Sequence, residues 1–229
     1  MQIQKYYMLA LSVIIFALPF LANLYFKEKG LKRALFNYVR SFSIVGLLLT
    51  LLMSFLVERG DIQFNSKFTS GLKLANLPIE SIALLFAIGF ASIALYELIS
   101  VKFKEKKILL DNTFFYLFAF TYFALSVVFS NYEYTSTIFF LNGVLMIAVS
   151  YFRNNNVFLS KNFYVFSLIS VITFILVSAI LTMTSMINYS TSSIAGFRIG
   201  SIPFEDFFFS FFILSSLLTV YYFFKKKVS

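Results

Sequence analysis

The sequence predicts an all-α integral membrane protein of about seven transmembrane helices, arranged as two parallel three-helix repeats and a linking helix. Three observations support this fold class: the apolar composition, seven hydrophobic runs, and an internal repeat. Of the 229 residues, 60% are hydrophobic and only 13% are charged. A soluble domain has roughly half of its residues apolar and a quarter charged, so the composition excludes an ordinary soluble protein.

Seven hydrophobic runs follow one another along the chain with short loops between them. A helix needs about 20 mostly apolar residues to cross the core of a bilayer. Runs of about that length cover residues 6–26, 38–57, 79–100, 113–130, 137–152, 162–186 and 205–224. Lys and Arg residues follow the first run where a signal peptide would have a cleavage site, so we expect a membrane helix there. The seven crossings leave no room for a separate soluble domain, and residues 1–229 form one polytopic domain.

The basic residues predict the orientation of these helices. Of the 19 Lys and Arg residues, 5 fall on one side of the predicted membrane and 14 on the other. The first group is Lys5, Arg59, Lys67, Lys73 and Arg198. The second is Lys27, Lys29, Lys32, Arg33, Arg40, Lys102, Lys104, Lys106, Lys107, Arg153, Lys161, Lys225, Lys226 and Lys227. The positive-inside rule places the N-terminus outside the cell and the C-terminus in the cytoplasm. The net charge of +9 therefore indicates membrane topology and not nucleic-acid binding.

An internal repeat relates the two halves of the chain. The stretch from Gly71 to Glu80 reappears from Gly196 to Glu205, with Gly, Pro and Glu identical at an offset of 125 residues. The offset also superimposes the second run on the sixth and the first roughly on the fifth. We therefore expect repeats over 1–104 and 132–229, joined by a linking helix within 105–131. Four crossings separate the third and seventh helices, so both Pro-x-Glu copies lie on the same side, as in a parallel repeat.

The chemistry open to this chain is limited by what it lacks. Cysteine and histidine are both absent, which removes disulfides, imidazole bases and the usual zinc and haem ligands. Carboxylates at membrane depth are costly and are candidates for function, and these are Glu80, Glu97, Glu205 and Asp206. The first-turn acids also suit a capping role, because Pro-x-Glu places a carboxylate at the positive end of a helix. Glu97 follows Tyr96 near the cytoplasmic end of its helix and is explained by that interfacial position.

Aromatic and polar side chains surround the second carboxylate pair. Phe208 and Phe212 lie three and seven positions after Glu205, on the same helical face. Aromatic faces stabilise a cation within about 6 Å, although rings of this kind also simply fill contacts with lipid. Hydroxyls and amides near the two helix entrances come from Asn65, Asn76, Asn188, Tyr189 and Ser201. Loop capping explains these polar residues equally well.

The stretch from Arg198 to Phe209, with Pro203, Glu205 and Asp206, resembles the Pro-x-Glu-(Glu/Asp) signature of the membrane-integral lycopene cyclases. That family is the heterodimeric type, whose two small subunits are fused in some lineages. The region from Asn65 through Pro78 and Glu80 is similar to the first subunit, except that Ser81 stands where the family usually has an acid. The resemblance covers nearly the whole chain.

The resemblance implies a non-redox isomerisation of the linear carotenoid lycopene to β-carotene. A carboxylic acid protonates the terminal double bond, the cation closes a ring, and a base removes a proton to leave a β-ionone end. Catalytic roles are expected for Glu205, Asp206 and Glu80, with Glu205 and Asp206 dividing the acid and base roles and Glu80 lining the same cavity. Substrate contacts are expected from Phe208, Phe212, Asn65, Arg198, Pro203 and Pro78. The chain has no Gly-x-Gly-x-x-Gly fingerprint, so the flavin-dependent type of cyclase is not expected. It also has no motif for phosphate, nucleotide or metal binding, so no cofactor or metal is expected.

The expected partners are lycopene or a related carotenoid and membrane lipids, and the sequence is compatible with a homo-oligomer. Two alternatives remain open at this point. One is a cyclase for another carotenoid, with a longer chain or a different ring isomer. The other is a carotenoid- or lipid-binding membrane protein without turnover, which Ser81 keeps open. A small transporter is disfavoured, because Glu80 and Glu205 stand at helix entrances and the repeat is parallel.

Overall fold

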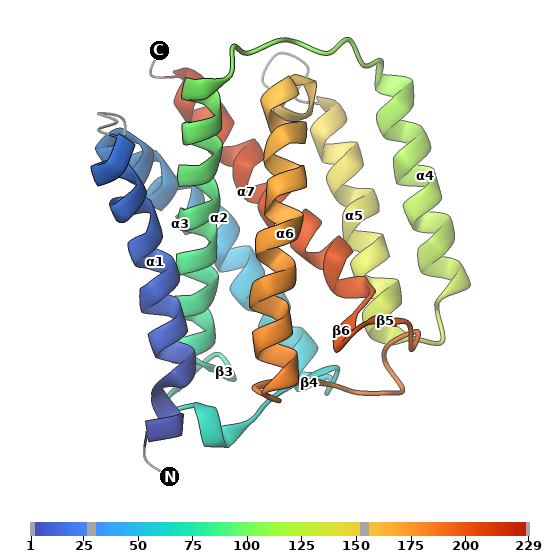
Figure 1. Ribbon diagram of the computed structural model, residues 1–229. Coiled ribbons are helices and arrows are strands. Elements are labelled where there is room, and N and C mark those ends of the chain that lie inside the picture. Colours follow the sequence, from blue (N-terminus) through green and yellow to red (C-terminus); the bar gives the residue numbers. More distant parts are fainter. Residues whose placement is uncertain (1–2, 27–30, 152–155, 228–229) are drawn as a thin grey trace.

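The structure is a computed structural model that describes residues 3–26, 31–151 and 156–227. Seven α-helices run along its long dimension (Figure 1). They are α1 (Tyr7–Phe26), α2 (Leu31–Glu58), α3 (Ile79–Lys102), α4 (Asn112–Val128), α5 (Glu133–Tyr151), α6 (Lys161–Met183) and α7 (Glu205–Lys227). Short 3-10 turns cover Ile3–Tyr6, Ser66–Phe68 and Val157–Leu159.

Five of these helices, namely α2, α3, α5, α6 and α7, are long and apolar enough to cross a bilayer. The two others contain shorter apolar stretches, Tyr7–Leu21 in α1 and Asn112–Val128 in α4. Exposed Leu, Ile, Val and Phe side chains cover the outside of the described part, as expected for a surface that faces lipid. The chain is therefore a helical, multi-pass membrane protein.

Three short antiparallel β-ribbons, which the hydrophobic pattern does not predict, lie in the loops at one end of the helices. β1 (Ile62–Phe64) pairs with β4 (Ile187–Tyr189), β2 (Lys73–Leu74) with β3 (Leu77–Pro78), and β5 (Arg198–Ile199) with β6 (Ile202–Pro203). The β2–β3 hairpin turns through Ala75 and Asn76, both with positive φ, as a two-residue hairpin of the primed type requires. Gly200 has a positive φ in the β5–β6 turn. Each hairpin leads directly into α3 or α7.

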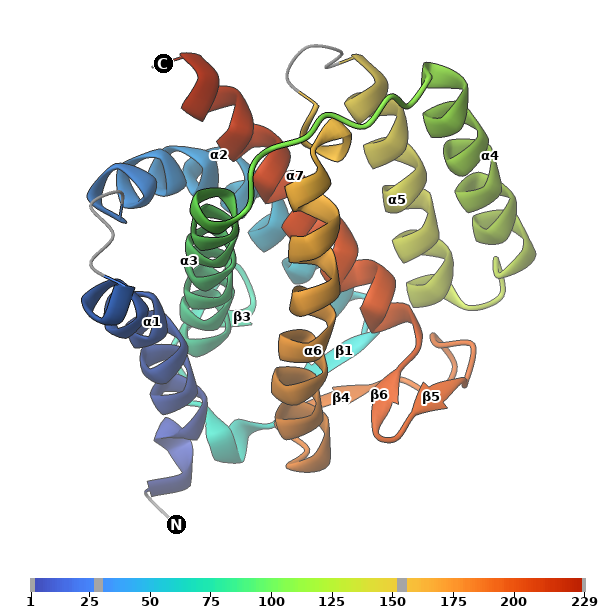
Figure 2. The same cartoon turned by 45° about the horizontal axis from the view of Figure 1, so that its top comes forward.

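The helices pack around α3 and α7, which contact each other and most of the remaining helices (Figure 2). α1 lies against α3, α5 lies against α4 and α7, and α2 and α6 each contact both α3 and α7. Gly89 of α3 permits a close approach of three helices, because a Cβ there would come within 2.9 Å of Leu217 on α7 and 3.0 Å of the Tyr38 hydroxyl on α2. The main core is built from aromatic and aliphatic side chains of α2 to α7.

The last residues of α1, α2 and α3 each lie 125 positions before the last residues of α5, α6 and α7. α3 and α7 both run from the end with the ribbons toward the opposite end, where the C-terminus lies (Figure 1). Lys73 and Arg198 lie at the ribbon end, and Lys104 and Lys225 belong to the opposite end. Lys27, Lys29 and Arg153, which belong to the group of 14 basic residues, lie outside the described residues.

Candidate active site

A cavity of about 400 Å³ lies among α1, α2, α3, α6 and α7, and residues of β1 and β4 contribute to its lining. Its lining is almost entirely aliphatic and aromatic. The lining hydroxyls of Thr50, Ser92 and Thr173 each donate to a carbonyl of their own helix. The buried Ser170 hydroxyl also lines the cavity and has no hydrogen-bond partner among the described residues. A cavity of this size and lining suits an elongated hydrocarbon and not a polar metabolite.

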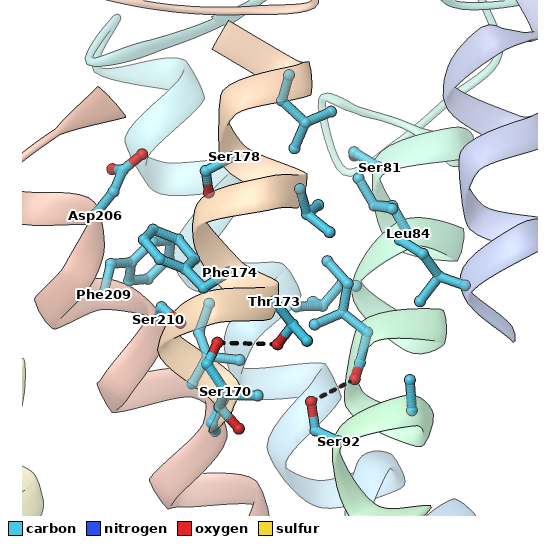
Figure 3. A pocket seen from close by; sticks show the side chains of 18 of the residues that line it. Ser81, Leu84, Ser92, Ser170, Thr173, Phe174, Ser178, Asp206, Phe209 and Ser210 are labelled. Carbon is cyan, nitrogen blue, oxygen red and sulfur yellow. Dashed lines mark hydrogen bonds between the residues drawn. The ribbon is translucent and has the colours of Figure 1, made fainter. Parts of the chain in front are cut away.

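Asp206, in the first turn of α7, is the acidic side chain among the described residues that line this cavity. Figure 3 shows it on the α7 wall, with Phe209 and Phe174 nearby and Ser81 and Leu84 across on α3. The residue is 5% exposed to solvent. A buried carboxyl at the edge of an apolar cavity is placed to meet a hydrocarbon directly.

Two tyrosine hydroxyls hold the Asp206 carboxylate. The Tyr134 hydroxyl, at the start of α5, donates to Oδ1 at 2.7 Å, and the Tyr189 hydroxyl of β4 donates to Oδ2 at 2.5 Å. Burial, followed by the negative charge of Asp206, raises the pKa of Tyr189 well above its ordinary value of 10. Tyr189 therefore stays a proton donor in this bond at neutral pH. Tyr189 also lines the cavity, so Tyr189 and Asp206 together form its polar end.

Glu205 precedes Asp206 but lies in a different environment, since neighbouring helical residues point about 100° apart. Its Oε1 accepts hydrogen bonds from the Thr135 hydroxyl at 2.6 Å and from the Ala195 backbone N–H at 2.7 Å. The side chain is 1% exposed and is not among the described residues that line the cavity. Glu205 therefore fastens the loop before β5 to the start of α7.

Glu80 has the same arrangement at the start of α3. Its Oε1 accepts the Ser70 backbone N–H at 2.6 Å, and the side chain is 2% exposed. Ser70 and Ala195 both stand ten residues before the glutamate that they contact. We expected Glu80 to line the cavity beside Asp206, but the described lining includes its neighbour Ser81 instead. The hydrogen bond to Ser70 turns the Glu80 carboxylate back toward its own loop.

None of the six residues expected to contact substrate belongs to the described lining of the cavity. Phe208 packs against Phe139 and Phe204 with ring centroids 5.0 and 5.1 Å apart, and Phe212 belongs to the core between α7 and its neighbours. Asn65 caps the 3-10 turn at Ser66–Phe68 and donates to the Ser185 carbonyl. Exposed Arg198 donates to the Ser201 carbonyl at 2.9 Å.

The two remaining expected contacts, Pro78 and Pro203, are buried at the ends of β3 and β6. Each proline pairs across its hairpin with the basic residue of the other strand, Lys73 or Arg198. The prolines therefore set the entry of α3 and α7.

Two residues that bind the carboxylates, Tyr134 and Thr135, could not be predicted from the sequence, because they stand about 70 positions from Asp206 and Glu205. Nothing in the local pattern of α5 distinguishes them from other first-turn polar residues. Both residues lie at the start of an apolar helix, where the repeat aligns them with Leu9 and Ala10, 125 positions earlier. This alignment is the one signal in the sequence that points to the two positions.

An ion-pair cluster fixes the start of α5, which carries Tyr134 and Thr135. Arg59, just after α2, contacts the Asp61 carboxylate at 2.5 Å and that of Glu133 at 3.2 Å. It also donates to the Thr137 hydroxyl at 3.0 Å and lies 4.9 Å from the centre of the Phe55 ring. Asp61 is fully buried. The cluster ties the end of α2 to the first turn of α5 beside the cavity.

The chain matches the family model described as Lycopene cyclase over residues 4–99 and 131–224. The two matched segments are consistent with two halves fused in one chain, and α4 falls between them. Comparison with curated proteins and with solved structures finds no match. The matched segments span most of the sequence, and the chain thus belongs to the lycopene cyclase family, membrane enzymes of the isomerase class that cyclise carotenoids.

Proposed function

We propose that this protein converts the linear ends of lycopene to β-ionone rings by acid/base chemistry without a redox step. The observation that carries the proposal is Asp206, a buried carboxyl held by two tyrosine hydroxyls at the polar end of an otherwise apolar cavity. Family membership supplies the reaction class, and this geometry supplies a group that can perform it.

The proposed reaction needs one proton donor, one proton acceptor and walls that tolerate a cation. The protonated Asp206 carboxyl gives its proton to the terminal carbon–carbon double bond. The resulting carbocation is attacked by a neighbouring double bond of the same molecule, which forms the ring bond and moves the positive charge into the ring. Loss of a ring proton to the Asp206 carboxylate leaves the β-ionone double bond and restores the acid. The product is an isomer of the substrate, so electrons and atoms balance without a cofactor.

Two features around Asp206 support these steps. The Tyr134 and Tyr189 hydroxyls stabilise the carboxylate that forms when the proton leaves, since hydrogen bonds to a charged acceptor are stronger than neutral ones. The Phe174 and Phe209 rings line the cavity, and aromatic faces stabilise a passing cation without reacting with it. An apolar lining also keeps water from capturing the carbocation.

In this scheme Asp206 alone transfers protons, whereas the sequence predicted that Glu205 and Asp206 divide the acid and base roles. The Glu205 Oε1 already accepts two hydrogen bonds on the loop side of α7, and Glu80 is engaged in the same way on α3. We propose that both glutamates hold the loops that close the ribbon end of the cavity. They are positioning residues in this scheme.

We also propose that residues 1–104 and 132–229 form two parallel three-helix halves joined by a linking helix, α4, within 105–131. The matched offsets of the helix ends and of the two glutamate contacts support this arrangement. The distribution of Lys and Arg supports a cell-membrane location with the ribbon end and N-terminus outside and the C-terminus in the cytoplasm.

Expression in bacteria that accumulate lycopene tests the function. Wild-type protein should yield one-ring and two-ring products with β-ends, separated by chromatography and identified by their absorption and NMR spectra. Asp206→Asn, which keeps the shape of the side chain, should reduce ring formation at least 100-fold. Glu97→Gln is the matched control, because Glu97 pairs with Lys225 at the opposite end of the helices.

Each other outcome excludes a part of the proposal. Unchanged lycopene that copurifies with the protein would identify a binding protein without turnover. Rings with the double bond at another position would show that the product is not the β-ring. Conversion of a longer carotenoid alone would show that lycopene is not the substrate. Full activity of Asp206→Asn would remove Asp206 from the mechanism.

A further inference from the structure

In both halves of the chain a glutamate at the start of a helix accepts a hydrogen bond from the preceding loop, but the carboxyl group that lines the cavity belongs to the second half. Glu80 and Glu205 accept the N–H groups of Ser70 and Ala195 at 2.6 and 2.7 Å, with identical spacing. The hairpins agree as well, since the Ile79 N–H donates to the Leu72 carbonyl and the Phe204 N–H to the Phe197 carbonyl. At an offset of 125, all of these residues correspond pairwise.

The acidic and phenolic groups of the second-half site have no equivalents at the corresponding positions of the first half. At the same offset, Asp206 corresponds to Ser81, Tyr189 to Phe64, Tyr134 to Leu9, and Thr135 to Ala10. Ser81 is the one polar residue among these four counterparts, and its hydroxyl donates to the Pro78 carbonyl at 2.7 Å. The first half therefore preserves the shape of the site without a group that transfers protons to a hydrocarbon.

Both versions of the site face the same cavity. Ser81 and Phe64 line it from the first half, and Asp206 and Tyr189 line it from the second. In Figure 3, Asp206 on α7 and Ser81 on α3 stand on opposite walls. Within the described lining, acid/base chemistry is thus available at one wall alone.

We propose that the cavity has one reaction centre, at Asp206, and that the enzyme closes one ring per binding event. This inference rests on the proposed function. A linear carotenoid carries its two ends at opposite extremes of a rigid conjugated chain, so only one end can lie at Asp206 at a time. A cavity of about 400 Å³ walled by packed helices gives that rod no room to reverse. The one-ring product must therefore leave and re-enter with its other end first.

An isotope chase with the purified enzyme in lipid vesicles tests this order. Enzyme is first loaded with ¹³C-labelled lycopene, and a large excess of unlabelled lycopene is added before the second ring can form. One ring per binding event predicts that labelled one-ring product accumulates and that labelled two-ring product falls in proportion to the excess. Labelled two-ring product that forms at the unchased rate would overturn the proposal, because both ends would then react without release.

A second measurement separates the number of reaction centres from the order of release. Purified one-ring carotenoid is given to wild-type protein and to Asp206→Asn, after gel filtration in detergent has shown that both are folded. A single centre predicts that Asp206→Asn loses the second cyclisation as completely as the first. Retention of either cyclisation by this variant would reveal another centre and overturn the inference. If the wild-type protein closes no ring at all, the proposed function fails instead, and the two failures are distinct.

Discussion

Gln63 and Asn188, which stand 125 positions apart, face each other as Cα partners at the centre of the antiparallel β1–β4 ribbon. Because the offset equals that of the sequence repeat, each half contributes the same segment to the ribbon. The flanking bonds are paired too, since the Asn65 N–H donates to the Met186 carbonyl and the Ser190 N–H to the Asp61 carbonyl. The ribbon thus joins the two halves beside the cavity.

This relationship explains how Tyr189 reaches Asp206. Tyr189 is the last residue of β4, where the ribbon pairs it with Ile62. Pairing fixes the direction of the strand, and the alternation of side chains along it then sets which face the tyrosine occupies. At the corresponding position of β1 stands Phe64, which packs against the cavity without a hydroxyl. A symmetric ribbon therefore supports an asymmetric site.

The two tyrosines that hold Asp206 should each contribute to the rate. A hydrogen bond to a charged group contributes about 1.5–3 kcal/mol, and about 1.4 kcal/mol corresponds to a tenfold change in rate. Tyr134→Phe and Tyr189→Phe should each lower the rate of ring closure about tenfold or more, measured as initial rates in vesicles. Tyr116→Phe, on the exposed surface of α4, is the control. An unchanged rate in both single variants would show that the hydroxyls do not act on the reacting carboxyl.

The two glutamates should behave alike as anchors of their loops. Glu205→Ala removes the acceptor of the buried Thr135 hydroxyl and one of the two acceptors of the Ala195 N–H, and Glu80→Ala removes the carboxylate acceptor of the Ser70 N–H. A lost hydrogen bond costs about 0.5–1.5 kcal/mol, so both alanine variants should unfold at lower temperature in detergent. Glutamine keeps an oxygen acceptor, and Glu205→Gln and Glu80→Gln should retain most stability and ring formation. Loss of activity in Glu205→Gln without loss of stability would instead assign Glu205 to proton transfer.

Arg59 should be the residue whose loss destabilises the ribbon end most. Asp61 is fully buried, and Arg59 is its ion-pair partner. Removing one partner of a buried pair costs about 3–5 kcal/mol, because an uncompensated charge remains. Arg59→Met should therefore lower the melting temperature followed by circular dichroism.

The double variant Arg59→Met/Asp61→Asn tests the cause of that loss. It removes the buried charge together with its partner and should recover part of the stability. If the double variant is less stable than Arg59→Met alone, the contacts of Arg59 with α5 and not its pairing with Asp61 explain the loss.

The absence of cysteine makes the orientation directly measurable. Lys73→Cys places a single thiol in the β2–β3 hairpin, and Lys104→Cys places one in the segment between α3 and α4, both at exposed positions. A maleimide that cannot cross membranes should label Lys73→Cys on intact cells and Lys104→Cys only after lysis. The reverse pattern would contradict the proposed orientation.

Much of the fold can be read from the sequence because the bilayer imposes a simple rule. Hydrophobic runs long enough to cross it form helices, and the observed helices fall on the seven predicted runs. The sequence also contains the two Pro-x-Glu copies, and the family match confirms the relationship that these motifs indicate. The short β-ribbons could not be predicted, since two or three paired residues leave no hydrophobic alternation to detect.

The arrangement of the site residues depends on contacts between residues that are far apart in the sequence. Both carboxylates of the second motif are visible in the sequence, but helix geometry and the surrounding loops decide that Asp206 faces the cavity while Glu205 faces the loop. Tyr134 reaches Asp206 from 72 positions away because α5 packs against α7. The sequence by itself determined the membrane helices, the repeated motifs and the family. Only the tertiary structure decided which carboxyl meets the apolar cavity, because side-chain direction and long-range packing are set when the helices come together.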